Sequence, residues 1–292
     1  MSSPTLTSAV RTRRATPADA ADCGRIFYEA FVAINQSHNF PPELPALEAG
    51  VGILQMLFSH PSFYCVVAER DGRIVGSNCL DERSAIAGLG PVSVDPKVQN
   101  SGIGRILMQT LIDHAREQRF AGVRLLQSTF HSRSLALYAK LGFDVREPMS
   151  VMQGRPKVRA INGYPVRRAA EGDLDACNRL CEQVHGYNRS VELREGIDHG
   201  TARVVERGGR ITSYASAFGY LGHAVAQSNE DLQALIAAAE DVSGAGIVVP
   251  TRNAEVFRWC LNNGMTIFQP MTLMTMGLYN EPAGAYLPSV LQ

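Results

Sequence analysis

The chain repeats one pattern of residues at a fixed distance along the sequence. Residues 13–25 carry Arg, Asp, Cys and Arg at the same spacing as residues 167–179, which lie 154 positions later. Both segments continue with the periodicity of an amphipathic helix. A chain of 292 residues could form one large domain or two medium ones. The repeat favours two similar domains.

A second repeated pattern follows the first in the same order. Residues 66–74 are typical of two strands joined by an Asp-Gly turn, and residues 204–211 of two strands joined by Gly-Gly. A helix followed by a hairpin in both halves is best explained by duplication. We therefore predict domains at residues 1–154 and 160–292, joined by a polar connection rich in turn residues.

The first half alternates helical and strand patterns. Helices are expected at residues 16–34, 102–118 and 132–141, strands at 63–69, 73–80, 87–94, 122–128 and 143–152, and an irregular or helical segment at 41–59. The predicted apolar face of the first helix consists of Cys23, Ile26, Phe27, Ala30 and Phe31, and that of the second of Ile106, Leu107, Thr110, Leu111 and His114. The fold class is α/β (α+β), with a mixed twisted sheet flanked by helices in each domain.

Composition excludes several functional classes. Lys plus Arg and Asp plus Glu both number 28, so bulk charge does not favour nucleic-acid binding. No window reaches 18 consecutive apolar residues, which argues against a membrane span. Residues 1–6 lack the order of a secretory signal, so we expect a cytoplasmic protein whose six cysteines are reduced and mostly buried. Without a C-x-x-C pair, a metal site is not expected.

The segment from residue 90 to 105 is the most informative for function. A strand should end at Val94, Pro96 stops it, and Gly102 and Gly104 stand where the next helix begins. The first N–H groups of a helix have no internal partner and attract anions, and glycines let a ligand approach the backbone. This arrangement suits a pyrophosphate, although a plain glycine-rich helix entry is the alternative. It matches neither the P-loop nor the dinucleotide fingerprint.

Gln99-x-x-Gly102-x-Gly104, directly after Val92-x-Val94-x-Pro96, resembles the acetyl-CoA-binding motif of the GNAT superfamily of N-acetyltransferases. Residues 137–143, a short helical pattern ending in Gly-Phe, resemble that family's second motif. Both motifs stand in the family's order and spacing. The resemblance covers residues 11–152 and implies acetyl-CoA as the co-substrate.

The resemblance also implies roles for single residues. Tyr138 would be the general acid that protonates the departing CoA thiolate. His131 stands where the family often has an asparagine that contacts CoA, and either CoA binding or surface placement remains open for it. The backbone of the strand would meet the pantetheine arm, and the loop would surround the pyrophosphate. These cofactor-binding residues are Val92, Ser93, Val94, Gln99, Asn100, Ser101, Gly102, Ile103, Gly104 and Arg105.

The positions of the family's acidic bases are not acidic in this chain. Leu126 and Gly88 occupy them. Asp81, Glu82 and His38 are candidate bases by location only, and a chain of water molecules could remove the amine proton instead. The polar segment 35–42 would contribute to the acceptor side, or be an ordinary surface loop.

The second half resembles the family without its cofactor loop. Residues 253–265 have the form of the second motif, with Cys260 where the first half has Tyr138, and we expect a buried structural cysteine there. Upstream, Glu230 and Asp231 occupy the first turn of the predicted helix, where they would repel a pyrophosphate. This half would support the first domain or close its substrate pocket. The tail 281–292 is not expected to be helical and would pack on a surface groove.

These observations favour an acetyl-CoA-dependent N-acetyltransferase, with direct attack by a primary amine of a small molecule or amino acid. The alternatives are a non-catalytic acyl-CoA-binding or regulatory module, and an enzyme that uses a longer acyl-CoA. We expect a small-molecule amine as partner, neither nucleic acid nor membrane, and a monomer or homodimer.

Overall fold

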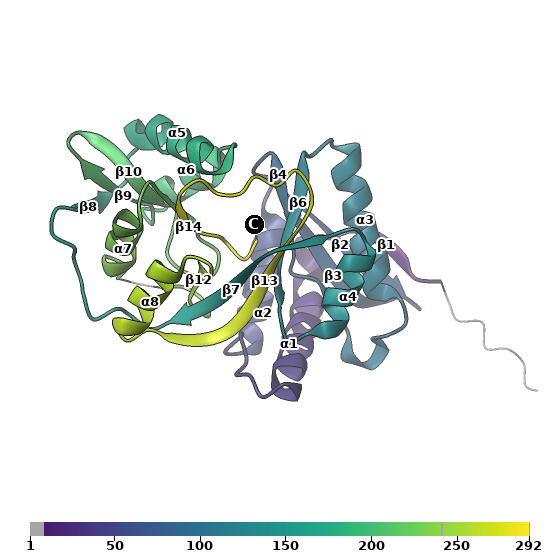
Figure 1. Ribbon diagram of the computed structural model, residues 1–292. Coiled ribbons are helices and arrows are strands. Elements are labelled where there is room, and N and C mark those ends of the chain that lie inside the picture. Colours follow the sequence, from purple (N-terminus) through teal and green to yellow (C-terminus); the bar gives the residue numbers. More distant parts are fainter. Residues whose placement is uncertain (1–8, 241, 292) are drawn as a thin grey trace, which may run out of the picture. The chain divides into compact units, whose positions relative to one another are not determined.

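The computed structural model describes residues 9–240 and 242–291 (Figure 1). Residues 1–6, which carried the prediction about a secretory signal, lie outside the described residues. The chain divides into two compact units. Unit 1 comprises Met1–Asp81 and Leu89–Arg119, and unit 2 comprises Glu82–Gly88 and Phe120–Gln292. Across the described ranges, we find no helix whose length and apolar character would let it cross a membrane.

Unit 1 contains an antiparallel sheet. Strand β2 (Phe63–Arg70) pairs with β1 (Arg11–Arg14) on one side and with β3 (Arg73–Asp81) on the other. The turn between β2 and β3 has positive φ at Asp71 and Gly72, as the predicted Asp-Gly turn requires. The short strand β5 (Ser93–Val94) pairs with β3. The expected strand 87–94 is therefore two strands, because Gly90 and Pro91 interrupt it after β4 (Ile86–Leu89), and proline has no N–H to donate.

The helices of unit 1 in the described part of the chain are α1 (Ala20–Ser37), α2 (Leu47–Ser59) and α3 (Ile103–Glu117). The first buries the predicted face, except that Phe31 is only half-buried. The predicted face of α3 is correct for Leu107 and Leu111, which are buried, and wrong for Ile106, which is 37% exposed; Thr110 and His114 are half-buried. The residues that α3 does bury form a stripe displaced around the helix axis from the predicted one. They are Ile103, Leu107, Met108, Leu111, Ile112 and Ala115.

The two sequence halves exchange strands in the first sheet of unit 2. The first half supplies β6 (Gly122–Ser128) and β7 (Asp144–Gln153), connected through α4 (Ser132–Lys140). The second supplies β12 (Ile247–Pro250) and β13 (Thr266–Gly277), connected through α8 (Ala254–Asn262). The order is β6-β13-β7-β12 with antiparallel pairs, and β4 lies parallel to β6. Each half therefore inserts one strand between two strands of the other.

The second sheet of unit 2 has the order β14-β11-β10-β9-β8, and all its pairs are antiparallel. These strands are Ala285–Leu287, Ala224–Ala226, Arg210–Ala215, Arg203–Arg207 and Val166–Arg168. The tail is not helical, as predicted. It does not lie on a surface groove, because its strand β14 pairs with β11 and is buried.

Alternate residues of the second sheet face two different helix layers. Val204 packs against α5 (Leu174–His185) and α6 (Ser190–Asp198). Its neighbour Val205 packs with residues of α7 (Asn229–Ala237) and α8. The sheet is thus covered by helices on both faces. The structure is a mixed α/β fold with twisted sheets flanked by helices, as the sequence predicted.

The repeated arginine and aspartate make the same contacts in both halves. Arg13 Nη1 and Nη2 each lie 2.8 Å from a carboxylate oxygen of Asp19, and its Nε lies 2.9 Å from Glu69. The Asp19 carboxylate also accepts from the backbone N–H of Thr16, at the turn before α1. This paired guanidinium, together with the hydrogen bonds from Thr16, lowers the pKa of Asp19 to about 2, against the effect of burial.

Arg167 contacts Asp173 through two nitrogens at 2.6 and 2.8 Å, and its Nε lies 2.9 Å from Glu206. The bidentate pair lowers the pKa of Asp173 as well. The same three-residue arrangement at the start of α1 and of α5 supports the duplication read from the sequence. The compact units do not follow the predicted boundary near residues 154–160, since the exchanged strands join both halves in unit 2.

Candidate functional site

The entry to α3 has the backbone that an anion-binding helix start needs. Gly102 is the N-cap residue with φ 85°, and Asn100 has φ 64°. Both values lie in the left-handed region, which glycine adopts freely and asparagine tolerates. A Cβ at Gly102 would meet nothing within 4 Å, so the backbone conformation is what calls for glycine here.

Side chains of the loop hold its own backbone. Ser101 Oγ donates to the carbonyl of Val98 at 2.6 Å, and Gln99 Nε2 donates to the carbonyl of Val94 at 3.2 Å. These two predicted cofactor-binding residues thus fix the shape of the loop. Their backbone groups, rather than their side chains, are the ones available to a ligand.

Exposure and charge at the start of α3 also suit an anion. Asn100, Ser101, Gly102 and Arg105 are exposed, whereas Ile103 is buried and anchors the first turn. The first turn carries no acidic residue. The first N–H groups of a helix lack carbonyl partners within it, and the helix dipole adds positive potential. This end of α3 therefore has the exposed backbone and the charge that suit a phosphate group.

The strand before the loop comes very close to β3. A Cβ on Gly76 would lie 2.5 Å from the carbonyl oxygen of Ser93, so only glycine allows this approach. The hydroxyl groups of Ser77 and Ser93 lie 3.3 Å apart in the interior. Val92 precedes β5 and is half-buried. The backbone from Val92 to Val94, predicted to meet the pantetheine arm, is thereby held in place on its β3 side.

Tyr138 lies on α4 and is buried, with 7% of its surface exposed. Its ring packs edge-on near Phe143, with the centroids 6.3 Å apart. Burial raises the pKa of the phenol, because the charged phenolate would lose its solvation. Tyr138 therefore keeps its proton at neutral pH, as a general acid must.

The other predicted residues near α4 and β6 have mainly local contacts. His131 is the N-cap residue of α4, and its carbonyl accepts from Gln127 Nε2 at 3.0 Å and Ser134 Oγ at 2.9 Å. Leu126 is half-buried against an apolar cluster of unit 2. The role of His131 in CoA binding stays a prediction.

The candidate bases lie in different settings. Asp81 ends β3 and is 1% exposed, whereas Glu82 is half-buried. His38 is exposed after α1, where its Nδ1 lies 3.0 Å from the carbonyl of Ile34. None of these observations selects one of the three. In the described ranges, His, Cys, Asp and Glu side chains form no group of three or more placed to hold a metal ion.

The helix start in the second half is filled by the chain's own carboxylate. Asp231, in the first turn of α7, is fully buried. Arg207 Nε lies 3.0 Å from Oδ1 of this carboxylate, and Arg207 Nη2 lies 3.0 Å from Oδ2. The hydroxyl groups of Thr212 and Ser228 donate to the same carboxylate at 2.5 and 2.8 Å. The structure places acidic residues in this first turn, as predicted. The carboxylate of Asp231 has its hydrogen-bond and ion-pair partners within the chain itself.

Cys260 is buried on α8, and burial raises the pKa of its thiol to about 12. A thiol with that pKa is not a reactive one, which agrees with the predicted structural role. All six cysteines are buried and free of disulfide bonds.

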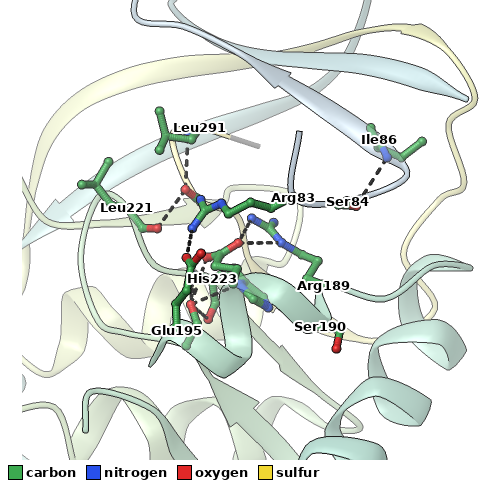
Figure 2. Close-up of polar contacts among 12 residues, drawn as sticks. Arg83, Ser84, Ile86, Arg189, Ser190, Glu195, Leu221, His223 and Leu291 are labelled. Atoms are coloured by element: carbon green, nitrogen blue, oxygen red, sulfur yellow. Dashed lines mark hydrogen bonds and ion pairs between the residues drawn. The ribbon is translucent and has the colours of Figure 1, made fainter. Parts of the chain in front are cut away.

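Sequence analysis missed a buried polar cluster in unit 2 (Figure 2). Arg189, the N-cap residue of α6, forms an ion pair with Glu192 in the first turn of that helix. Glu192 Oε1 also lies 2.8 Å from His223 Nδ1. His223 Nε2 lies 2.9 Å from the hydroxyl of Tyr214. Arg83 Nη1 lies 2.6 Å from Glu195 Oε2, and Figure 2 shows these two side chains pointing toward each other. We name this group the unit 2 polar cluster, and its members are Arg83, Arg189, Glu192, Glu195, Tyr214 and His223.

Burial and neighbouring charges set the protonation states of the cluster. Burial alone would raise the pKa of Glu192, but Arg189 and His223 hold it well below its usual range. For His223, burial is the main cause that lowers the pKa to about 4, with Arg189 adding to it. At neutral pH, Glu192 is therefore charged and His223 is neutral. Only the i, i+3 spacing of Arg189 and Glu192 could have indicated this pair from sequence.

With this geometry in place, comparison with known proteins becomes informative. The model of the acetyltransferase (GNAT) family matches residues 26–143, which contain the α3 entry and Tyr138. Over residues 26–143, the chain therefore carries a GNAT-family acetyltransferase domain. The GNAT domain includes both motifs on which the predicted resemblance rested.

Solved structures extend the likeness to the rest of the chain. A putative acetyltransferase from Pyrococcus horikoshii has a TM-score of 0.71 at 19% identity, over 98% of this chain and 97% of its own. A GCN5-related N-acetyltransferase from Sphaerobacter thermophilus has a TM-score of 0.60 at 16% identity, over 93% of this chain and 96% of its own. At such identities the likeness establishes the fold alone. The GNAT domain and the second half together therefore have a fold found in other chains.

Curated relatives match a shorter stretch. Mycothiol acetyltransferase of Thermomonospora curvata is 34% identical over 91 residues, which is 31% of this chain and 30% of that protein. The mycothiol acetyltransferase of Kocuria rhizophila is 31% identical over 97 residues, covering 31% and 32%. The chain thus spans about a third of the length of these relatives.

Proposed function

We propose that the protein is an N-acetyltransferase that moves the acetyl group of acetyl-CoA to a primary amine of a small molecule or an amino acid. The observation that carries the proposal is the α3 entry, an exposed left-handed Gly102 before a helix without acidic first-turn residues, within a GNAT domain. The two mycothiol acetyltransferases match only in part, so they support acetyl transfer and do not give the acceptor.

The pyrophosphate of acetyl-CoA would bind the N–H groups at the start of α3. Exposed backbone and the open space beside Gly102 fit a bulky anion, and Arg105 adds a positive charge. The loop residues proposed to surround the pyrophosphate are Gln99, Asn100, Ser101, Gly102, Ile103, Gly104 and Arg105. His131 is proposed as a further CoA contact.

The chemistry requires little of the protein beyond positioning and one proton. The amine nitrogen attacks the thioester carbonyl, a C–N bond forms, and the C–S bond breaks to release the CoA thiolate. A backbone N–H between Val92 and Val94 would stabilise the oxyanion that develops on the carbonyl. No covalent enzyme intermediate is involved.

Tyr138 would donate its proton to the departing thiolate. Its raised pKa means that the phenol carries this proton throughout the neutral range. Water would take the amine proton, since neither Leu126 nor Gly88 offers a carboxylate.

We also propose that residues 1–154 and 160–292 are the two duplicated domains, that the second supports the first, and that the protein acts in the cytoplasm as a monomer or homodimer. The shared arginine–aspartate arrangement supports the duplication. Six buried free thiols are compatible with a reducing compartment.

The test is thiol release from acetyl-CoA in the presence of a panel of small amines and amino acids. The wild type should release thiol with at least one acceptor, and Tyr138→Phe should retain CoA binding while releasing thiol far more slowly. CoA binding without thiol release from any acceptor would contradict the enzyme assignment and leave a binding module.

A further inference from the structure

The helix that carries Tyr138 has few buried side chains to hold it in place. Among the residues of α4, all of which the structure describes, Tyr138 alone is buried. A helix of nine residues is marginal on its own, so its position must come from tertiary contacts. Burial is the cause that raises the pKa of the phenol, and no hydrogen bond from the described residues contributes. The position of the phenol therefore depends on how α4 is held.

Gln127 holds the start of α4 from the neighbouring strand β6. Its side chain is buried, with 3% of the residue exposed. Its Nε2 donates to the carbonyl of His131 at 3.0 Å and to the hydroxyl of Ser134 at 3.1 Å. It also donates to the carbonyl of Ser128. Because two of these partners are carbonyl oxygens, which only accept, the NH₂ end of the amide must face them.

The hydroxyl of Ser134 completes this contact. It donates to the His131 carbonyl at 2.9 Å, so the amide and the hydroxyl meet at the same oxygen. Residues four apart lie on the same face of a helix, one turn from each other. Ser134 stands four residues before Tyr138. Gln127 therefore holds the turn of α4 that directly precedes the phenol.

Stability alone does not explain a glutamine at this position. The Oε1 of Gln127 is buried, and within residues 9–240 and 242–291 it has no hydrogen-bond partner. A buried acceptor without a donor is unfavourable, whereas an aliphatic side chain on the same strand carries no such penalty. The contacts of Nε2 with α4 are thus the feature that distinguishes glutamine from an aliphatic residue here.

The second half has neither the glutamine nor the tyrosine. Gln127 stands eleven residues before Tyr138, and Val249 stands eleven residues before Cys260. Val249 lies on β12 and is fully buried. The first turn of α8 is instead capped by its own N-cap residue, Asn253. The half with the phenol therefore has an amide on the strand before its helix, and the half with the cysteine has an aliphatic residue there.

We propose that Gln127 is a positioning residue for acetyl transfer and acts through Tyr138. Its amide holds the first turn of α4 against β6, and this fixes the phenol where it donates its proton to the CoA thiolate. Gln127 takes no part in the chemical step itself. The inference rests on the proposed function, because it takes Tyr138 as the proton donor.

A double-mutant cycle of Gln127→Val and Tyr138→Phe tests the proposal, with thiol release from acetyl-CoA as the assay. Gln127→Val should lower kcat about 10- to 100-fold, because a small displacement of a reacting group is costly. The Kd for CoA should change less than about twofold, since the proposed pyrophosphate site is on α3. In the Tyr138→Phe background, Gln127→Val should lower kcat by less than about twofold. An equal loss of kcat in both backgrounds would overturn the proposal.

Two further positions give graded and matched controls. Ser134→Ala removes one partner of the amide and should lower kcat less than Gln127→Val does, whereas Ser134→Thr keeps the hydroxyl and should retain most of the kcat. Gln233 is a buried glutamine on α7, 7% exposed, and Gln233→Leu should change kcat less than about twofold. A loss in Gln233→Leu as large as that in Gln127→Val would contradict a specific role of the contact with α4.

Hydrogen exchange of the full chain, measured by mass spectrometry, needs no acceptor. In Gln127→Val the backbone amides of α4 should exchange about 10-fold faster, while those of α8 keep their rates. Unchanged exchange in α4 would overturn the proposal even if the wild type acetylates amines. If Gln127→Val does not fold, Gln127→Met keeps the volume of the side chain and takes its place with the same expectations.

The two assays separate this proposal from the proposed function. If the wild type releases no thiol with any amine, the proposed function fails, and the role of Gln127 in acetyl transfer fails with it. Normal thiol release by the wild type, together with wild-type kcat in Gln127→Val, would overturn the positioning role and leave the proposed function intact.

Discussion

The N-termini of α3 and α7, one in each half of the chain, differ in the negative charge that they place at the positive end of the helix dipole. At α3, Gly102 leaves exposed backbone N–H groups and no acid in the first turn. At α7, Ser228 caps the helix and the buried Asp231 carboxylate takes the anion's place, matched by Arg207. At α7 the carboxylate offsets the positive pole of its helix, whereas at α3 that pole is left for the proposed external anion. The comparison teaches that a helix start of this kind can either present its N–H groups to an external anion, as proposed for α3, or match them with a carboxylate of the chain, as at α7.

The largest effect is expected where Tyr138 in the first half corresponds to Cys260 in the second. Tyr138→Phe should lower kcat for thiol release by roughly 10²–10⁴-fold, because the proton donor to the thiolate is lost. Since burial raises its pKa above the ordinary 10.0, ionisation of Tyr138 should not reduce kcat below that pH. Cys260→Ala is the matched control, with kcat changed by less than about twofold. Equal kcat in Tyr138→Phe and wild type would remove the tyrosine from the mechanism.

The next effect comes from moving the acidic residue of α7 into α3. Gly104 and Glu230 hold the same position, two residues after the N-cap. Gly104→Glu should weaken CoA binding about 10- to 10³-fold, through repulsion of the pyrophosphate. Calorimetric titration with CoA measures this. Gln118→Glu adds the same charge at the other end of α3 and should change the affinity little. Unchanged affinity in Gly104→Glu would place the pyrophosphate elsewhere.

Removing the negative charge of Asp231 at the start of α7 tests the role of this internal carboxylate. Asp231→Asn leaves Arg207 without its buried partner and should lower the free energy of unfolding by roughly 2–4 kcal/mol. Urea unfolding followed by circular dichroism gives this value. Glu230→Gln, at the exposed neighbour, should cost less than about 1 kcal/mol. A variant Asp231→Asn as stable as the wild type would show that the ion pair is dispensable.

The smallest effect concerns the contact that both halves share. The depressed pKa of Asp19, about 2 instead of 3.8, stabilises the fold above pH 3.8, and this stabilisation is lost as pH falls through 2. Asp19→Asn should therefore cost about 2 kcal/mol at pH 7, with the difference narrowing below pH 4. Urea unfolding at several pH values measures it, with the exposed Asp22→Asn as control. A difference independent of pH would contradict the ionic explanation.

Much of the fold was predictable because its signals are local. The Asp-Gly turn, the α1 face and the boundaries of β6 depend on residues close in sequence. The face of α3 was predicted only in part, because Ile106 and His114 fit an apolar stripe as well as the buried Met108 does, and only packing separates them.

In the candidate site too, some residues could be predicted from local sequence and others are brought together only by the fold. The glycines at α3 and the tyrosine of α4 follow from short motifs, whereas the polar cluster of unit 2 joins residues far apart in the chain. Arg83 and Glu195, for example, are 112 positions apart. No sequence period connects such a pair, and its ion pair exists only once the chain has folded.

The sequence by itself predicted the duplication and a helix start suited to phosphate, and it determined the acidic start of the counterpart helix, because each depends on neighbouring residues and backbone preferences. Only the tertiary structure decided that β13 enters between β6 and β7, and that β7 enters between β12 and β13. It also decided that Arg124 is buried and that its Nε finds no hydrogen-bond partner within residues 9–240 and 242–291. Strand pairing and charge balance depend on which distant segments meet, and that is settled by the packing of the whole fold.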